Sequence, residues 1–309
     1  MIESGTGRIS DALLDWLQAV LGGETQITRV VPQDGGTSSA LYLVDARRGG
    51  RDLHLLLRRY TNSEWLAEEP DLPHHEAAAL ERARRASVPT PELVALDADG
   101  AAAGTPSLLM TRLPGAVVLQ PRDFDGWLRQ QAQALLSIHT LDAHDLPWRY
   151  FPYNHPAEMH PPVWSQAQEL WEQAIDIARG PAPDHRLCFI HRDFHPVNVL
   201  FQDSHLSGVV DWPNACSGPP GADAAWMRIN LALGWGPQAA EHFLQIYQEQ
   251  AGGGGGYHPY LDLLAILEWL PGPPEVYPPW VTFGLRGLTG ARMIASIESH
   301  LQSVLKKLG

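Results

Sequence analysis

Apolar residues near the start of the chain recur at helical spacing. Between residues 10 and 23 they fall on every third or fourth position, which places them on one face of a helix. Ser10 or Asp11 can cap the first turn, and Gly22-Gly23 follows the last apolar residue. The pattern predicts an amphipathic helix that ends at the two glycines.

Short runs rich in β-branched and apolar residues follow, interrupted by glycine pairs that favour turns. One helix with apolar residues at helical spacing lies among them, at about residues 74–85. We therefore expect a small antiparallel sheet with an inserted helix, built from strands at residues 27–31, 40–45, 53–60, 93–97 and 107–111. The first three strands are expected to form a meander.

Beyond Pro114 the hydrophobic pattern is mainly helical. The glycine tract 252–256 predicts a flexible loop, and the proline-rich stretch 271–279 predicts a rigid connector. Helices are expected at residues 124–141, 163–178, 222–233, 237–250, 260–270 and 283–305, with short strands at 188–191, 197–201 and 208–212. The chain thus divides into a sheet-rich region, residues 1–113, and a mainly helical region, residues 114–309, in an α+β protein.

Composition narrows the location and partners of the protein. The chain contains neither a signal-peptide pattern nor an apolar run near the roughly 20 residues that cross a bilayer, which favours a cytoplasmic protein without a membrane partner. Cys188 and Cys216 lack the spacing of a zinc site, so we expect free thiols. A net charge of -13 without any block of basic residues argues against nucleic acid as a partner.

The stretch of residues 189–200 carries the most informative pattern, H-R-D-x-x-x-x-N, and an Asp follows at the end of an apolar run. Phosphoryl transfer in protein kinases uses these spacings. Asp193 can accept the proton of an attacking hydroxyl, so we predict it as the catalytic carboxylate. The Asn198 amide oxygen and the Asp211 carboxylate can bind a Mg²⁺ ion that bridges nucleotide phosphates.

Two alternatives remain open from the residues alone. His191, Asp193 and His195 could bind a metal in a hydrolase, although no HExxH or similar pattern accompanies them. A non-catalytic nucleotide-binding module is also possible, because the only lysines, Lys306 and Lys307, stand at the end of the chain and none is placed to hold phosphate. Mg²⁺-dependent nucleotide turnover would separate these alternatives.

The sequence HRDFHPVN, followed by VVDW, resembles the aminoglycoside phosphotransferase and choline kinase family, a branch of the protein-kinase-like fold. Arg192 and Val197 replace glycines that are common there. The resemblance runs from Gly35 to about Asp223. It implies a bilobal fold with a nucleotide-binding lobe at 1–113 and a lobe with the catalytic loop and acceptor site at 114–309. It also implies ATP or GTP as phosphate donor, Mg²⁺, and a monomer or homodimer.

The resemblance extends to further positions. It places Arg58 where kinases carry a phosphate-binding lysine and makes Glu76 its partner. Arg58 and Arg59 leave opposite faces of a strand, so only one can take this role, and Arg59 is the alternative. Asp223 matches a carboxylate that braces the catalytic loop. Two further sets of nucleotide-binding residues follow from the resemblance. The loop that covers the phosphates corresponds to Gly36, Thr37, Ser38 and Ser39. The hinge that contacts the purine corresponds to Met110, Thr111 and Leu113.

The acceptor is predicted from charge. Residues 113–250 carry 15 Asp or Glu against 7 Arg and no Lys, a balance of -8. Such a surface favours a cationic ligand, so an amine-bearing small molecule is expected, with an amino sugar as the leading candidate. Choline, homoserine, macrolides, nucleoside antibiotics and sugars remain alternatives. A macrolide or a nucleoside would suit an apolar pocket, for which seven tryptophans are available: Trp148, Trp164, Trp171, Trp226, Trp235, Trp269 and Trp280.

Overall fold

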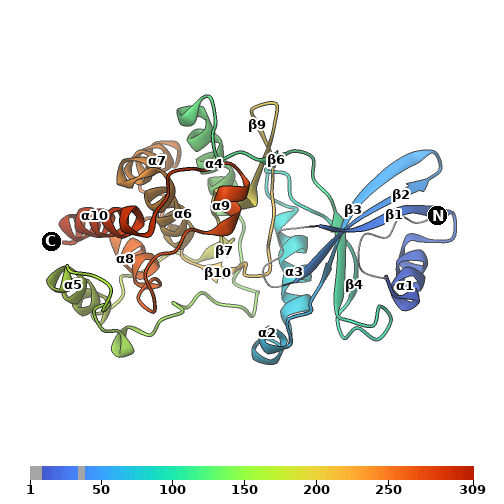
Figure 1. The fold of residues 1–309 in the computed structure, drawn as a ribbon, viewed down its shortest axis with the longest axis horizontal. Helices are drawn as coiled ribbons and strands as arrows, with labels where there is room; N and C mark the ends of the chain where they lie inside the picture. Colours follow the sequence, from blue (N-terminus) through green and yellow to red (C-terminus); the bar gives the residue numbers. More distant parts are fainter. Residues whose placement is uncertain (1–8, 34–38) are drawn as a thin grey trace. The chain divides into compact units, whose positions relative to one another are not determined.

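The computed structural model describes residues 9–33 and 39–309 (Figure 1). The chain divides into two compact units. The first comprises Met1–Arg85 and Pro89–Leu113, and the second comprises Ala86–Val88 and Pro114–Gly309. The α+β class expected from the sequence is confirmed.

The first unit contains a five-stranded antiparallel sheet in the order β1-β2-β3-β5-β4. The first three strands form the predicted meander, while β5 lies between β3 and β4. The strands are β1 (Thr25–Gln33), β2 (Ala40–Arg48), β3 (Arg51–Arg59), β4 (Leu93–Asp97) and β5 (Ser107–Thr111). Helix α1 (Asp11–Leu21) begins where Ser10 accepts the Leu13 N–H, and it packs its apolar face on the sheet.

Two further helices belong to this unit, α2 (Ser63–Glu68) and α3 (Leu72–Ala83). Helix α3 is the predicted helix, shifted by two residues. Helix α2 was not predicted, because it is short and none of its residues is buried, so it carries no apolar face. Asn62 caps it by accepting the Glu64 and Trp65 N–H groups.

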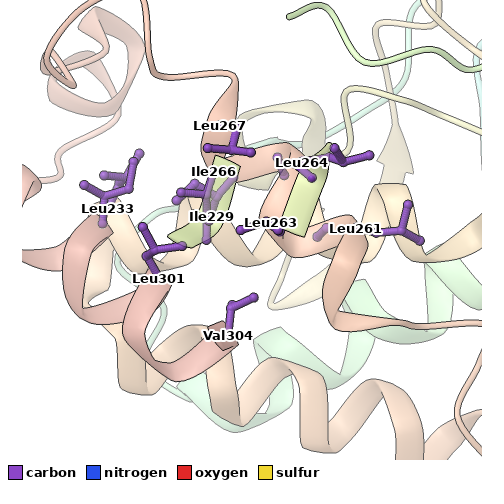
Figure 2. Packing of buried hydrophobic residues seen from close by; sticks show 14 of the residues in the cluster. Ile229, Leu233, Leu261, Leu263, Leu264, Ile266, Leu267, Leu301 and Val304 are labelled. Atoms are coloured by element: carbon purple, nitrogen blue, oxygen red, sulfur yellow. The ribbon is translucent and has the colours of Figure 1, made fainter. Parts of the chain in front are cut away.

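The second unit is mainly helical. Its helices are α4 (Phe124–Ile138), α5 (Gln168–Ala178), α6 (Pro220–Trp235), α7 (Pro237–Gln250), α8 (Pro259–Leu267), α9 (Pro278–Thr282) and α10 (Gly290–Leu308). Helix α6 is buried along almost its whole length. Figure 2 shows how side chains of α6, α8 and α10 gather in one cluster, among them Ile229, Leu263 and Leu301. This burial makes α6 a rigid support for residues at its first turns.

Short strands frame the loop that carries the catalytic motif. Strand β7 (Cys188–Ile190) pairs with β10 (Cys216–Gly218), and β8 (Val199–Gln202) lies between β6 (Ala116–Val117) and β9 (His205–Val209). The motif occupies the segment between β7 and β8, which includes a 3₁₀ turn at Pro196–Asn198. Another 3₁₀ turn lies at Pro156–Glu158.

Several predicted boundaries were wrong. The helix expected at 283–305 begins only at Gly290, because Gly284 and Gly287 adopt positive φ angles that a helix does not contain. The connector expected up to residue 279 ends earlier, since α9 begins at Pro278. The strand expected at 208–212 is β9, which ends at Val209, so Asp211 lies beyond the strand with φ of 71°.

The glycine tract 252–256 lies in a loop, as predicted, and its last two residues, Gly255 and Gly256, are packed. A Cβ on Gly256 would approach the Pro220 ring to 2.5 Å, and Tyr247 donates a hydrogen bond to the Gly255 carbonyl. Both cysteines are buried free thiols, as predicted. In the part of the chain that the structure describes, none of the helices is long and apolar enough to span a bilayer.

Candidate active site

Asp223, in the first turn of α6, holds the start of the catalytic loop. Its Oδ2 accepts the main-chain N–H of His191 at 2.8 Å, and its Oδ1 accepts that of Arg192 at 2.6 Å. His139 Nε2 lies 3.0 Å from Oδ2. Asp223 is fully buried, so these charge-assisted bonds are shielded from water. The carboxylate therefore ties the loop to the deeply buried helix α6, which is the bracing role expected from the sequence.

His191 links the loop to the segment before Asp211. Its Nε2 lies 3.0 Å from the Val210 carbonyl, and its Nδ1 accepts the Asp193 N–H at 3.3 Å. Its ring also packs on Trp212, with 4.4 Å between centroids. Both ring nitrogens are therefore engaged within the loop, which leaves neither for a metal ion.

Asp193 is oriented through both carboxylate oxygens. The Trp226 indole Nε1 donates to Oδ1 at 2.8 Å, and the Asn198 amide Nδ2 lies 3.2 Å from Oδ2. His195 Nε2 is 3.6 Å from Oδ1. Burial holds the pKa of His195 below its usual value, against the opposing effect of the Asp193 charge, so the ring is neutral near pH 7.

Asn198 and Asp211 are linked through the backbone. The Asn198 carbonyl accepts the Val210 N–H at 2.9 Å, and its Nδ2 also donates to the Asp193 carbonyl at 2.9 Å. Its Oδ1 accepts no hydrogen bond from the described residues. An amide oxygen and a carboxylate are the hard ligands that Mg²⁺ prefers, and Mg²⁺ commonly takes its other ligands from phosphates and water. The donor set fits this ion.

The described residues do not support the alternative of a metal-hydrolase site. Within residues 9–33 and 39–309, no group of three or more His, Cys, Asp or Glu side chains is placed to hold a metal ion. The engaged nitrogens of His191 also argue against that alternative.

A pocket opens beside Asp193, with a volume of about 410 Å³ that includes space open to solvent. It lies entirely within the second unit. Its walls are Tyr150, Tyr153, Arg192, Asp193, Asn214, Ala222, Trp226, Ala265 and Glu268. Of the tryptophans singled out from the sequence, Trp226 lines this pocket, whereas Trp171 and Trp280 lie in the core.

Glu268 follows the last residue of α8 and gives the pocket a second carboxyl group. Burial raises the pKa of Glu268 to about 7, and the Asp193 charge acts in the same direction. The Arg192 guanidinium and a hydrogen bond from the Tyr153 backbone oppose this rise. Near neutral pH this group therefore exchanges between its charged and neutral forms.

In the first unit, the structure decides between the two neighbouring arginines. Arg58 Nε lies 3.1 Å from Glu76 Oε2, both side chains are buried, and the Tyr60 hydroxyl donates to the same oxygen at 2.6 Å. Arg59 leaves the other face of β3 and donates to the Ala103 carbonyl at 3.2 Å. Arg58 is thus the partner of Glu76.

Other positions predicted for nucleotide binding are only partly described. Ser39 is buried, and its Oγ accepts a hydrogen bond from Arg58 Nη1 at 3.4 Å. Gly36, Thr37 and Ser38 lie outside the described residues. Met110 is buried and pairs with Leu56, Thr111 ends β5, and Leu113 is partly exposed two residues later.

A sheet-rich unit with a buried Arg–Glu pair and a helical unit with an Asp–Asn–Asp loop define a kinase-like phosphotransferase. Residues 29–263 match the Phosphotransferase enzyme family, and the chain belongs to that family. The resemblance noted from the catalytic motif is thereby confirmed.

Curated relatives include the homoserine kinase of Pseudomonas aeruginosa, from three strains. The identity is 31% over 144 residues, which cover 42% of this chain and 41% of the relative. The match therefore spans about two fifths of the length of these relatives.

Solved structures share the fold along nearly the whole chain. A thermostable mutant of aminoglycoside phosphotransferase APH(4)-Ia, in complex with ADP and hygromycin B, is 14% identical with a TM-score of 0.59, covering 96% of this chain and 99% of that one. Macrolide 2'-phosphotransferase MphH from Brachybacterium faecium is 18% identical with a TM-score of 0.56, covering 93% and 97%. At these identities the likeness concerns the fold.

Of the nine residues that line the pocket, only Asp193 was predicted as a site residue; Tyr153, Arg192, Trp226 and Glu268 are among those that were not. Arg192 had been noticed only as a substitution for a common glycine, and Trp226 only as one of several tryptophans. No local pattern marks Tyr153 or Glu268, because they come from segments far from the catalytic loop.

Proposed function

We propose that the protein transfers the γ-phosphate of ATP or GTP to a hydroxyl group of a small amine-bearing acceptor. The observation that carries this proposal is Asp193, oriented through both oxygens and facing a pocket that also contains Glu268. Membership of the phosphotransferase family supports the class of reaction.

In this proposal the acceptor hydroxyl lies in the pocket beside Asp193. The hydroxyl oxygen forms a bond to the γ-phosphorus while the bond from that phosphorus to the β–γ bridging oxygen breaks. Asp193 takes the hydroxyl proton, so the products are a phosphate monoester and the nucleoside diphosphate. The donor bonds from Trp226 and Asn198 keep the accepting oxygen aimed at the acceptor.

Nucleotide-binding roles fall, in this proposal, to residues predicted from the sequence. Asn198 and Asp211 would bind Mg²⁺, which when bound supplies positive charge against the phosphate oxygens. Arg58, oriented by Glu76, would replace the usual lysine as the phosphate ligand, since a guanidinium binds phosphate in a bidentate manner. Ser39 and residues 36–38 would cover the phosphates, and Met110, Thr111 and Leu113 would contact the purine.

The acceptor would be recognised through its amine. Glu268 offers a carboxylate that can bind an ammonium group on the wall shared with Asp193. Two amine-bearing classes come from the comparisons: aminoglycosides, such as the hygromycin B bound to a solved relative, and homoserine. A macrolide, nucleoside antibiotic, choline or sugar remains the alternative. The need for a nucleotide donor leads us to place the reaction in the cytoplasm.

The test is a screen of hydroxyl acceptors with Mg²⁺-ATP and Mg²⁺-GTP, in which acceptor-dependent nucleoside diphosphate formation is measured. Asp193→Ala should lower kcat on the order of a hundredfold to ten-thousandfold while nucleotide affinity changes little. Asp176→Ala, at an exposed ion pair on α5, is the matched control and should leave kcat unchanged. Full turnover by Asp193→Ala would refute the proposal.

A further inference from the structure

Arg192 is a cation at the wall of the acceptor pocket, directly before the catalytic Asp193. Its backbone has φ of 66°, a conformation that few residues other than glycine adopt without cost. Glycine would adopt this φ without the strain that a Cβ brings, yet an arginine occupies the position.

Aromatic side chains hold the guanidinium in place. Its Cζ lies 4.2 Å from the centroid of the Phe151 ring and 4.3 Å from that of Tyr153, and Nη2 donates to the Phe151 carbonyl at 2.9 Å. Phe151 and Tyr153 pack edge to face, and each is more than half exposed. The contacts fix the plane of the fork at the pocket wall.

The hydrogen-bonding capacity of this arginine is only partly used. Nε is buried and donates no hydrogen bond to the described residues. Among the described residues, no carboxylate lies within salt-bridge distance of the guanidinium. Glu268 and Asp193 line the same pocket without forming that salt bridge. A partly buried cation without an ion-pair partner is stabilised when a ligand supplies an anion.

We propose that Arg192 binds a carboxylate of the acceptor while Glu268 binds its ammonium group, so that the acceptor is a zwitterionic hydroxy compound of the hydroxy-amino-acid class. The inference rests on the proposed function and narrows it. A pocket with one cationic and one anionic wall beside the catalytic carboxylate matches a zwitterion better than a polycation, which Arg192 would repel. The hydroxyl would then be presented to Asp193 by two charged contacts.

The first test compares acceptors that differ only in the anion. L-Homoserine and L-serine are paired with their methyl esters, which keep the amine and hydroxyl but lose the carboxylate, and kanamycin serves as a polycation without a carboxylate. We expect kcat/KM for a free acid to exceed that for its ester on the order of 10- to 100-fold, the usual effect of a hydrogen bond to a charged group. ADP formation and the ³¹P spectrum of the product are measured.

The second test uses variants of Arg192. Asn tolerates a positive φ, so Arg192→Asn removes the guanidinium with little backbone cost and should abolish the preference for acid over ester by raising the KM of the acid. The KM for ATP should be unchanged. Arg192→Lys keeps the charge and should retain part of the preference. Arg129→Asn, at an exposed ion pair on α4, is the control for loss of one positive charge. Melting temperatures check that each variant is folded.

The outcomes separate the inference from the function on which it rests. Transfer to kanamycin or to the esters at least as efficient as to the free acids would overturn the inference and leave the kinase function standing. Equal losses toward acid and ester in Arg192→Asn would also overturn it, because a purely structural arginine gives that result. Absence of transfer to any hydroxyl acceptor in the broader screen would instead refute the proposed function.

Discussion

Two arginines of the second unit meet very different surroundings. Arg228, on α6, is fully buried, and its guanidinium contacts Asp262, Glu241, Tyr257 and the Ala240 carbonyl. Arg192 faces the pocket, and among the described residues the only hydrogen-bond acceptor of its guanidinium is the Phe151 carbonyl. The first arginine is satisfied by the protein itself, whereas the second retains capacity for a ligand. The difference separates an arginine that joins helices from one that is available for binding.

The largest expected effect lies at Arg228. Arg228→Met leaves the buried Asp262 without its cation, which should destabilise the second unit by about 3–5 kcal/mol. The melting temperature should fall by about 5–15 °C. Turnover per folded molecule should be unchanged, because Arg228 is not a pocket residue.

The double variant Arg228→Met with Asp262→Leu is the control for this effect. It removes both charges, so much of the stability should return if the loss comes from an unpaired carboxylate. A single variant that is as stable as the wild type would show that the comparison between the two arginines is misplaced.

Arg58 combines the properties of the two arginines compared above, because it is paired with Glu76 and is also proposed to bind a ligand. Arg58→Ala should raise the KM for Mg²⁺-ATP on the order of tenfold to a hundredfold, since a charge-assisted contact to phosphate is lost. Arg59→Ala, on the opposite face of the same strand, should change it less than twofold. Isothermal calorimetry with Mg²⁺-nucleotide measures the affinities directly. The reverse ranking would assign the phosphate contact to Arg59.

Trp226 tests whether orientation of Asp193 matters beyond its charge. Trp226→Phe removes the indole donor to Oδ1 and keeps an aromatic wall, so kcat should fall about fivefold to fiftyfold. Trp235→Phe, on the same helix, is the control. If both variants have the same kcat as wild type, Trp226 serves only for packing.

Glu268, whose pKa is raised from 4.5 to about 7, is expected to affect stability in a pH-dependent way. The folded protein then binds more protons than the unfolded chain between these values, so stability should decline as pH rises through that window. Glu268→Gln should remove this decline and be more stable than wild type at pH 8, on the order of 1–3 kcal/mol. Urea titrations at pH 5 and pH 8 measure the difference. A wild-type stability that is constant over this range would contradict the assignment.

Glu268 also predicts a pH dependence of acceptor binding. The carboxylate must be ionised to attract an ammonium group, so the KM of an amine-bearing acceptor should fall as pH rises from 6 to 8. In Glu268→Gln the KM should be higher and nearly independent of pH in that range. Acceptors without an amine provide the control.

The sequence pattern alone was enough to predict the class of the protein, and it also predicted the residues of the proposed catalytic loop. Asp193, Asn198 and Asp211 lie on neighbouring segments joined by short turns. Their separation along the sequence therefore largely determines how they are arranged in space. Strand alternation likewise established that only one of Arg58 and Arg59 could serve. The strands from 93–97 and 107–111 were predicted at their observed bounds because their apolar runs are short and sharply ended.

Only the tertiary structure decided which residues meet at the site. Glu76 selects Arg58 over Arg59 because α3 places it on that face of β3, and Trp226 reaches Asp193 from 33 residues away. Glu268 enters the pocket from the end of α8, and Tyr153 enters from an irregular segment. Such meetings depend on how buried helices pack over long sequence separations, and local spacing does not encode that packing. The residues of the proposed catalytic loop are therefore close in sequence and could be predicted from it. The acceptor pocket forms only when α6 and α8 pack together.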